Sequence, residues 1–382
     1  MGNIPKVTIL YANGNLLQDV SAIDGIAALM GTGVTAGLLG VPKTVFNLDD
    51  AVAQGFTEIA EPAMYRHLKE FYGEVGGNQE LHIMIVADTV TLAQMLDNTN
   101  ANGAKKLVAD GQGKIRLLGV FRKPVGGYSG GANFIDSDVT TAITNSKVFG
   151  QARLTELAPL RILIEGRVQN PSAGNTLLPN TSTNGFAAVV LGGSLNDGSA
   201  SVGLALGRAV AYPAHVKIGK VENGPLTIAN CYIGDKALKD VAALDTYHGN
   251  GFMTFVSHPQ KAGFFFGIDR MCSIDDYRLL AYGRLVDKAA VIATATYVEQ
   301  IEDEVDTEAN GNIASYVVND LKNQIEQQIN VAMAAQISSV AALINPNQNM
   351  INTGKLTVKL RIQPKGYKSF IDVEIGLIAP TA

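Results

Sequence analysis

The chain has 382 residues, of which 47% are hydrophobic and 17% are charged, and its formal net charge is −5. This length exceeds the roughly 250–300 residues that one core usually supports, so more than one domain is expected. The negative net charge argues against a protein whose main task is to bind nucleic acid phosphates.

The cysteines and the N-terminus bear on the compartment. Cys231 and Cys272 are the only cysteines. Two are too few for a disulfide framework, and their spacing is not that of metal ligands, so we expect small buried side chains in a reducing compartment. The N-terminal residues MGNIPK lack the apolar segment of a signal peptide. We therefore expect a chain that is made and kept inside a cell, at least at first.

Predicted elements begin with two short strands in residues 7–18, joined by an Asn13–Gly14 turn. Residues 25–42 carry no charge, but their glycines, threonines and proline dilute the hydrophobicity. The segment is also at the short limit for a membrane span. A buried strand followed by a turn is the better interpretation of this segment.

From residue 47 to residue 212 the pattern alternates between helices and continuous apolar strands. Helices are predicted at 47–56, 60–72, 91–99, 138–158 and 200–212, and buried strands at 81–87, 115–121, 160–166 and 185–193. Such alternation predicts a parallel or mixed α/β sheet with flanking helices. Residues 168–185 are polar and rich in Asn, Pro, Ser and Thr, which indicates a surface loop.

The C-terminal part has a different, α+β pattern. Long helices are predicted at 275–299 and 313–337, and an acidic connection separates them. We therefore divide the chain into an N-terminal arm (1–22), an α/β region (23–245) and a C-terminal α+β domain (246–382) that ends in a strand arm.

Residues 355–380 show the alternation of two β-strands. Lys359 and Arg361 on the first strand would attract Asp372 and Glu374 on the second. A hairpin alone is marginally stable in water, so it needs a partner, either the helix at 313–337 or a sheet in another chain. The alternating apolar positions are Leu356, Val358, Leu360, Ile362, Ile371, Val373, Ile375 and Leu377.

One motif matches an enzyme. In GYSGG, Ser129 lies between Gly127 and Gly131, as in the nucleophile elbow of serine hydrolases. The elbow requires a tight strand-to-helix turn, whereas here the next helix starts only near Asp138. Ser129 is therefore expected in a surface loop. The candidate bases His215, His248 and His258 have no signature neighbourhood.

A second motif matches part of a calcium-binding loop, but its twelfth position falls on Val317, which lacks the bidentate acid. We expect a solvated connection between helices there. No cofactor, metal or catalytic residue is predicted. The matching positions are Asp306, Glu308, Asn310 and Gly311.

Several stretches resemble the contractile tail sheath proteins of bacteriophages and related injection systems. They are TVFNLDDAVAQGF, HLKEFYGEVGGNQELHIMIV and GFFFGIDRMCSIDDYRLLAYGRLVDKAAVIATATYVEQIEDEV, the last with a DDY…L…R-x-x-D helix. The helix at 313–337 and the terminal strands follow in the family's order. The resemblance covers the first and last thirds of the chain, indicates a divergent branch, and is less clear at 120–245.

This resemblance implies a structural subunit without an active site. Such subunits form a helical sheath of six-fold rings around a tail tube, and they contract when the baseplate triggers them. The implied partners are copies of the chain, the tube and the baseplate, with no nucleic acid and no membrane insertion. The implied location is the bacterial cytoplasm during assembly, then a virion tail or injection particle.

The resemblance also implies terminal arms that add strands to the sheets of neighbouring subunits. Two alternatives stay open: another tail or virion subunit, such as a tube or baseplate protein, and a serine hydrolase that uses Ser129. The candidate arm residues are Val7, Ile9, Tyr11, Leu356, Val358, Leu360, Ile362, Ile371, Val373 and Ile375.

Overall fold

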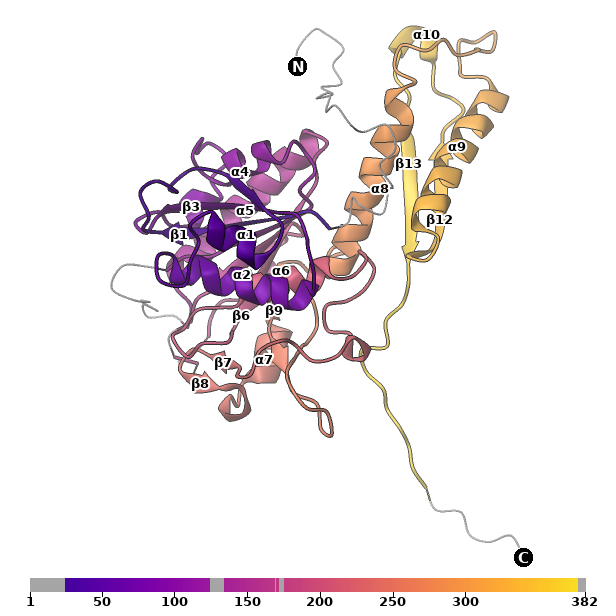
Figure 1. Cartoon of the computed structure of the whole chain (residues 1–382). Helices are drawn as coiled ribbons and strands as arrows, with labels where there is room; N and C mark the ends of the chain where they lie inside the picture. Colours follow the sequence, from indigo (N-terminus) through magenta and orange to yellow (C-terminus); the bar gives the residue numbers. More distant parts are fainter. Residues whose placement is uncertain (1–24, 124–133, 169, 172–174, 377–382) are drawn as a thin grey trace, which may run out of the picture.

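The computed structural model describes residues 25–123, 134–168, 170–171 and 175–376. Figure 1 shows a large α/β part and, beside it, an elongated C-terminal part, from which the end of the chain leads away. The N-terminal arm candidates Val7, Ile9 and Tyr11, the motif around Ser129, and Leu377 lie outside the described residues.

A seven-stranded sheet in the order β2-β3-β1-β4-β5-β6-β9 forms the centre of the large part. Neighbouring strands are parallel except β2, which is antiparallel to β3. The inner strands are buried along almost their whole length, which explains their continuous apolar sequences. The strands are β1 (Ala27–Gly33), β2 (Lys43–Val45), β3 (Leu81–Ala87), β4 (Leu117–Val120), β5 (Arg161–Gly166), β6 (Ala187–Leu191) and β9 (Phe252–Met253).

Helices cover both faces of this sheet. Figure 1 shows α4 and α5 on one side of it and α2 and α6 on the other. The mixed α/β sheet with flanking helices that the sequence predicts is confirmed, although α4 was missed. The helices are α1 (Leu48–Ala53), α2 (Pro62–Val75), α3 (Leu92–Met95), α4 (Ala104–Asp110), α5 (Ser137–Thr155) and α6 (Val202–Val210).

Two glycines allow α2 and α6 to pack very closely. A Cβ atom on Gly203 would lie 2.2 Å from the carbonyl oxygen of His67, and one on Gly207 would lie 2.6 Å from that of Phe71. The two glycines are one helical turn apart, so they share one face of α6. Glycine at these two positions therefore lets the backbones of α2 and α6 touch, and any larger residue there would push the two helices apart.

Short elements complete the large part and lead toward the C-terminal part. The last strand of the large sheet, β9, comes after residue 245 in the chain. The domain boundary predicted at that residue stays a prediction. The short elements are 3-10 turns at Pro179–Ser182, Val221–Asn223 and Leu238–Asp240, strands β7 (Tyr232–Ile233), β8 (Lys236–Ala237), β10 (Phe255–Val256) and β11 (Phe265–Phe266), and helix α7 (Leu244–Gly249).

The C-terminal part consists of two long helices, α8 (Leu280–Val298) and α9 (Ser315–Met333), and a two-stranded antiparallel sheet of β12 (Ile337–Ile344) and β13 (Val358–Pro364). A short helix, α10 (Met350–Thr353), lies between the strands. The hydrophobic core between helices and sheet contains Leu285, Ala289, Ile292, Ile325, Ile329 and Met333.

The predicted terminal hairpin is wrong in its pairing. β13 pairs with β12, with Ala342 opposite Leu360, and not with the segment from residue 370 onward. The helix predicted to reach residue 337 ends at Met333, and the strand ISSVAALI follows it. Its alanines and serines resemble a helix end, but burial of Ala342 and Ile344 against α9 selects the strand. The expected packing of a hairpin on this helix does occur, with β12 as the second strand.

The apolar segment at 25–42 forms the buried strand β1 and a turn, as the sequence predicts. None of the helices in the described ranges has the length and apolar character needed to cross a membrane.

Candidate assembly interface

A buried polar joint connects the large part to α8. Arg161, the first residue of β5, donates to both carboxylate oxygens of Asp287 at 2.6 and 2.5 Å. It also donates to the carbonyl oxygens of Gly283 (3.1 Å) and Gly185 (2.6 Å). Both charged side chains are almost fully buried, so this pair holds α8 at a fixed position against the sheet.

A second set of contacts strengthens the joint. Arg284 donates to the carbonyl oxygens of Ala209 (2.8 Å) and Tyr212 (3.2 Å) just where α6 ends. A cation there satisfies carbonyl groups that the helix leaves unpaired. Arg284 and Asp287 are the charged residues of the R-x-x-D helix noted in the sequence. The R-x-x-D motif therefore marks the two residues of α8 that bind the large part, a role that the sequence alone does not reveal.

The edges of the β12–β13 sheet are open within the described ranges, where no third strand pairs with it. Along β13, Val358, Leu360 and Ile362 are half-buried against the helices, while Lys359 and Arg361 are exposed. An open edge with this alternation is a template for another strand.

Beyond β13 the chain forms an extended C-terminal segment, residues 368–376, which we call the arm. It leads away from the body (Figure 1). Ile371, Val373 and Ile375 are 73%, 72% and 89% exposed, and they alternate with Asp372 and Glu374. Folded proteins rarely leave such an alternating apolar segment uncovered.

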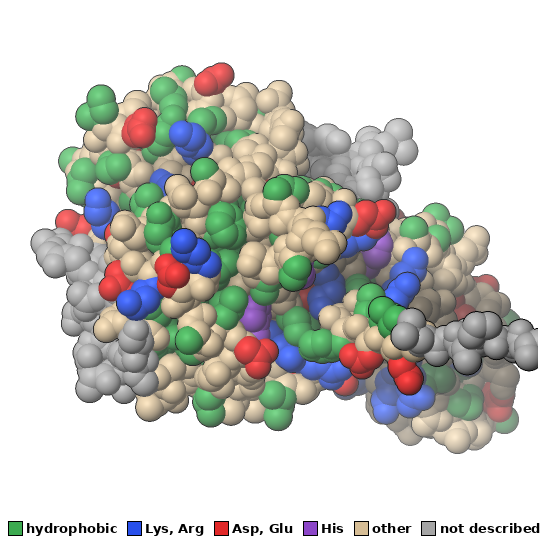
Figure 2. Space-filling view, turned by 90° about the horizontal axis from the view of Figure 1, so that it is seen from below, with side chains coloured by type: hydrophobic (Ala, Val, Ile, Leu, Met, Phe, Trp, Pro, Cys, Tyr) green, Lys and Arg blue, Asp and Glu red, His purple; other side chains and the backbone are tan. Residues whose placement is uncertain are grey.

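The face seen in Figure 2 has a different character. Its hydrophobic side chains are spread among charged and polar ones and form no single continuous patch. Scattered exposed hydrophobic side chains are normal for a protein surface. The arm therefore differs from this face in its regular alternation.

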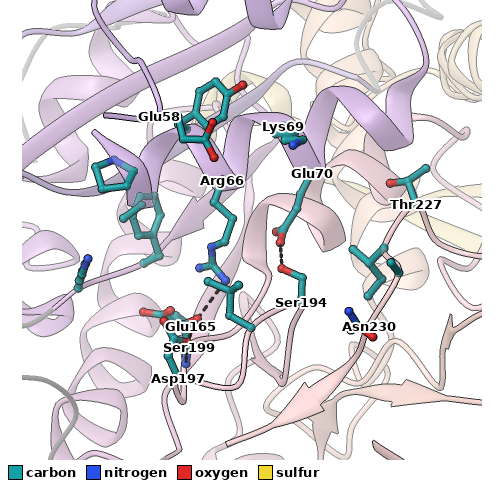
Figure 3. Close-up of a pocket in the computed structure, with 18 of the residues that line it drawn as sticks. Glu58, Arg66, Lys69, Glu70, Glu165, Ser194, Asp197, Ser199, Thr227 and Asn230 are labelled. Carbon is teal, nitrogen blue, oxygen red and sulfur yellow. Dashed lines mark hydrogen bonds between the residues drawn. The ribbon is translucent and has the colours of Figure 1, made fainter. Parts of the chain in front are cut away.

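A cleft of about 480 Å³ lies at the carboxyl ends of β4, β5 and β6, a common place for ligands in α/β sheets. Figure 3 shows Arg66 and Glu70 of α2 pointing into it. Arg66 donates to Ser199 Oγ at 3.0 Å, and Ser194 Oγ donates to Glu70 Oε1 at 2.5 Å. These polar groups bind one another, so they tie the loop after β6 to α2.

Glu165 is fully buried beside this cleft. Its carboxylate accepts the backbone N–H groups of Arg122 (2.8 Å) and Ala200 (3.2 Å). Burial raises the pKa of Glu165 to about 7, although the nearby Arg167 charge opposes the shift. Burial also holds the pKa of His67 well below its ordinary value. His67 is therefore neutral near pH 7, whereas Glu165 loses its proton in the neutral range.

The histidines suggested as partners of Ser129 have other surroundings. The carbonyl oxygen of His215 accepts a hydrogen bond from Tyr367. His248 is partly buried, which lowers its pKa, and the ring of His258 lies 5.3 Å from that of Phe265. Ser129 itself lies outside the described residues.

The calcium-like loop forms local hydrogen bonds. Asp306 accepts the hydroxyl of Tyr316, and Glu308 accepts that of Ser315 at 3.3 Å. No group of His, Cys, Asp or Glu side chains suited to a metal is found in the part of the chain that the structure describes.

Cys231 and Cys272 are free and buried, as predicted. Burial raises the pKa of both thiols, that of Cys272 to about 12.

Two sequence profiles of one family match the chain almost from end to end. The DUF2586 N-terminal domain matches residues 4–270, and the DUF2586 C-terminal domain matches residues 276–382. The chain belongs to the DUF2586 family. No curated protein matches its sequence.

Solved structures similar to this DUF2586 protein are those of contractile sheaths. It is 14% identical to the helical sheath of the anti-feeding prophage in its contracted state, with a TM-score of 0.60 over 98% of this chain and 99% of that one. The contracted sheath complex of the extracellular contractile injection system PVC is 11% identical to this chain, with a TM-score of 0.60 over 98% of both chains. A sheath tail protein from Listeria innocua is 10% identical, with a TM-score of 0.50 over 90% of this chain and 98% of that one.

This DUF2586 protein therefore has the fold of contractile sheath proteins. The fold expected from the sequence resemblance is confirmed over nearly the whole chain, including the middle region where the resemblance was less clear.

Proposed function

We propose that this DUF2586 chain is a structural subunit of a contractile sheath, which surrounds a tail tube and drives its ejection. The observation that carries this proposal is an exposed, alternating arm on a sheath fold whose C-terminal sheet has open edges. The partners are copies of the chain, in six-fold rings, together with tube and baseplate proteins. The particle is a virion tail or an injection system assembled in the bacterial cytoplasm.

The arm of one subunit pairs along the open edge of β13 in a neighbour. Main-chain hydrogen bonds supply the strength of such β-augmentation, and side chains set the register. In this arrangement Ile371, Val373 and Ile375 face the helices, next to the half-buried apolar face of β13. Asp372 and Glu374 then lie on the exposed face, which carries Lys359 and Arg361. Opposite charges across neighbouring strands attract.

The N-terminal residues Val7, Ile9 and Tyr11 are the proposed strand for the other edge of the sheet, at β12. Their alternation favours this role, but they lie outside the described residues. With both edges occupied by arms from other copies, each C-terminal part links several subunits. Such links allow a lattice to rearrange without coming apart.

Contraction in this proposal is a rotation of whole subunits. The buried joint of Arg161, Arg284 and Asp287 supports it, because the large part and α8 are held together by charged groups that would be costly to separate inside the protein. Motion is then expected at subunit interfaces and in the arms, as in other rigid-body transitions.

Electron microscopy of concentrated purified protein in negative stain tests the proposal. The expected result is hollow tubes or rings of constant diameter, formed alone or around the cognate tube protein. Thin tubes without a central space for a tube protein would favour a tail tube subunit instead. A chain that stays monomeric in the presence of tube and baseplate proteins would contradict a sheath role.

A further inference from the structure

We propose that Tyr367 is a positioning residue that anchors the arm to the large part of its own subunit. We infer that a force applied to the arm acts on the contacts of Tyr367 before it acts on the hydrogen bonds between β12 and β13. The role in a lattice rests on the proposed sheath function, whereas the anchor itself is a property of the single subunit.

The contacts of Tyr367 bridge segments far apart in the sequence. Its hydroxyl donates to the carbonyl oxygen of His215 at 2.7 Å, in the loop that follows α6. Its ring lies 5.7 Å from the ring of Tyr282 in α8, and the ammonium group of Lys217 lies 5.1 Å from the ring centre. The side chain is half-buried although the residues on both sides are exposed. One residue in an otherwise exposed stretch is thus fixed to the body.

Lys217 extends this anchor in two directions. Its ammonium nitrogen lies 3.4 Å from Asp269 Oδ1 and 3.4 Å from the hydroxyl oxygen of Ser369. Asp269 is buried, and its other carboxylate oxygen accepts the N–H of Ala281 at the start of α8. The anchor therefore reaches the start of α8, the helix that the joint fixes to the large part. The next residue, Phe370, is 82% exposed, so the free arm begins there.

The direction of load explains why this position matters. β13 ends at Pro364, which pairs with Ile337 at the open end of the hairpin. A force applied directly there would break the ladder one pair at a time. With Tyr367 held, the force passes instead into the loop at His215 and into α8. Loss of the anchor would also add residues 365–369 to the free length, about 17 Å of slack at roughly 3.3–3.6 Å per residue.

The anchor is tested on the single subunit with trypsin, since Lys365 and Lys368 flank Tyr367. Tyr367→Ala should speed cleavage after Lys365 at least tenfold. Tyr367→Phe keeps the ring and should speed it about fivefold, the usual net effect of one hydrogen bond. The matched control is Phe370→Ala, which removes an exposed ring from the same arm and should change nothing. Equal cleavage rates for Tyr367→Ala and the unmodified chain would overturn the anchor.

Single-molecule pulling tests the load path, with handles on the C-terminus and on an exposed cysteine introduced by Lys105→Cys in α4; the native cysteines are buried. The first rupture force should fall in Tyr367→Ala and stay unchanged in Phe370→Ala. An unchanged force in both variants contradicts the proposed load path. Both measurements use the free subunit, so they stand even if no tubes form. A failure to form tubes bears only on the proposed function.

Discussion

Arg161 in β5 and Asp287 in α8 form a buried ion pair between residues 126 positions apart, with N–O distances of 2.6 and 2.5 Å. Because both side chains are buried, water cannot hydrogen-bond to one of them when its partner is removed. Together with the hydrogen bonds of Arg284, the pair therefore holds the C-terminal part against the large part, as the proposed rotation of whole subunits requires.

The first prediction concerns this pair. Asp287→Ala leaves the Arg161 charge buried without its carboxylate, and it should lower the free energy of unfolding by about 3–5 kcal/mol. Urea denaturation followed by circular dichroism measures the change. Glu222→Ala is the control, because its partner Lys220 forms an exposed ion pair with it, and it should leave the midpoint unchanged. A loss no greater than that of the control would contradict the role of the joint.

Glu165 predicts a pH dependence of stability. Its pKa of about 7 in the folded protein lies above the ordinary value of 4.5, so the folded state holds this proton more tightly than the unfolded state. The contribution of Glu165 to the free energy of unfolding is therefore fully present below about pH 4.5 and is lost as the pH rises to about 7. The loss is at most on the order of 3 kcal/mol.

Urea unfolding at pH values from 4.5 to 8 checks this sign. The difference between the unmodified chain and Glu165→Gln isolates the group, since the amide cannot titrate. Stability of the unmodified chain should fall relative to the variant across this window. Glu58→Gln, on the exposed rim of the same cleft, should leave the pH profile as it is. Parallel profiles for Glu165→Gln and the unmodified chain would contradict the prediction.

The close packing of α2 on α6 gives a third prediction. Gly203→Ala adds a Cβ atom that would lie 2.2 Å from the carbonyl oxygen of His67. Although alanine favours helices, the helices must separate to admit it, so we expect a loss of about 1–3 kcal/mol. Gly77→Ala, where no heavy atom lies within 4 Å of the added Cβ, is the control. The melting temperatures of the two variants should therefore differ by several degrees.

Ser129 allows a test of the remaining enzymatic alternative. Ser129→Ala should leave assembly and particle activity unchanged, and an active-serine probe should not label the unmodified chain. Labelling that disappears in Ser129→Ala, with the fold preserved, would favour a hydrolase.

The elements that the sequence predicts well are those with a local cause. β3 and β5 are continuous apolar runs because both faces of their sheet are covered, and such runs are visible without any structure. In contrast, β12 was missed because half of its residues face solvent and its alanines suit a helix equally well. With β12 missed, β13 had no visible partner except the segment that followed it.

The site residues show the same division. The alternation of Ile371, Val373 and Ile375 is local, so the sequence singles them out. Arg161 and Tyr367 act through partners more than a hundred positions away, and nothing in their immediate sequence marks those partners. Only the R-x-x-D spacing in α8 hinted that charged residues had a defined place there.

The last prediction tests the pairing of the arm with β13 through its charges. The double variant Lys359→Glu, Arg361→Glu places like charges on both strands and should prevent tube formation, at a cost of roughly 0.2–1 kcal/mol for each repelling pair at every link. Asp372→Lys with Glu374→Lys should do the same.

The chain that carries all four changes restores opposite charges in the reverse order, and it should form tubes again. Because Lys359, Arg361, Asp372 and Glu374 are exposed in the subunit, none of the variants should change its melting temperature, so a defect in assembly is separable from misfolding. Truncation after Gly366, which removes Tyr367 together with the arm, should likewise leave a folded, soluble subunit that forms no tubes. A peptide of residues 367–380 should then occupy the open edge, since β-augmentation relies mainly on main-chain pairing. Tubes formed equally well by the two double variants, or by the truncated chain, would show that the links between subunits are made elsewhere.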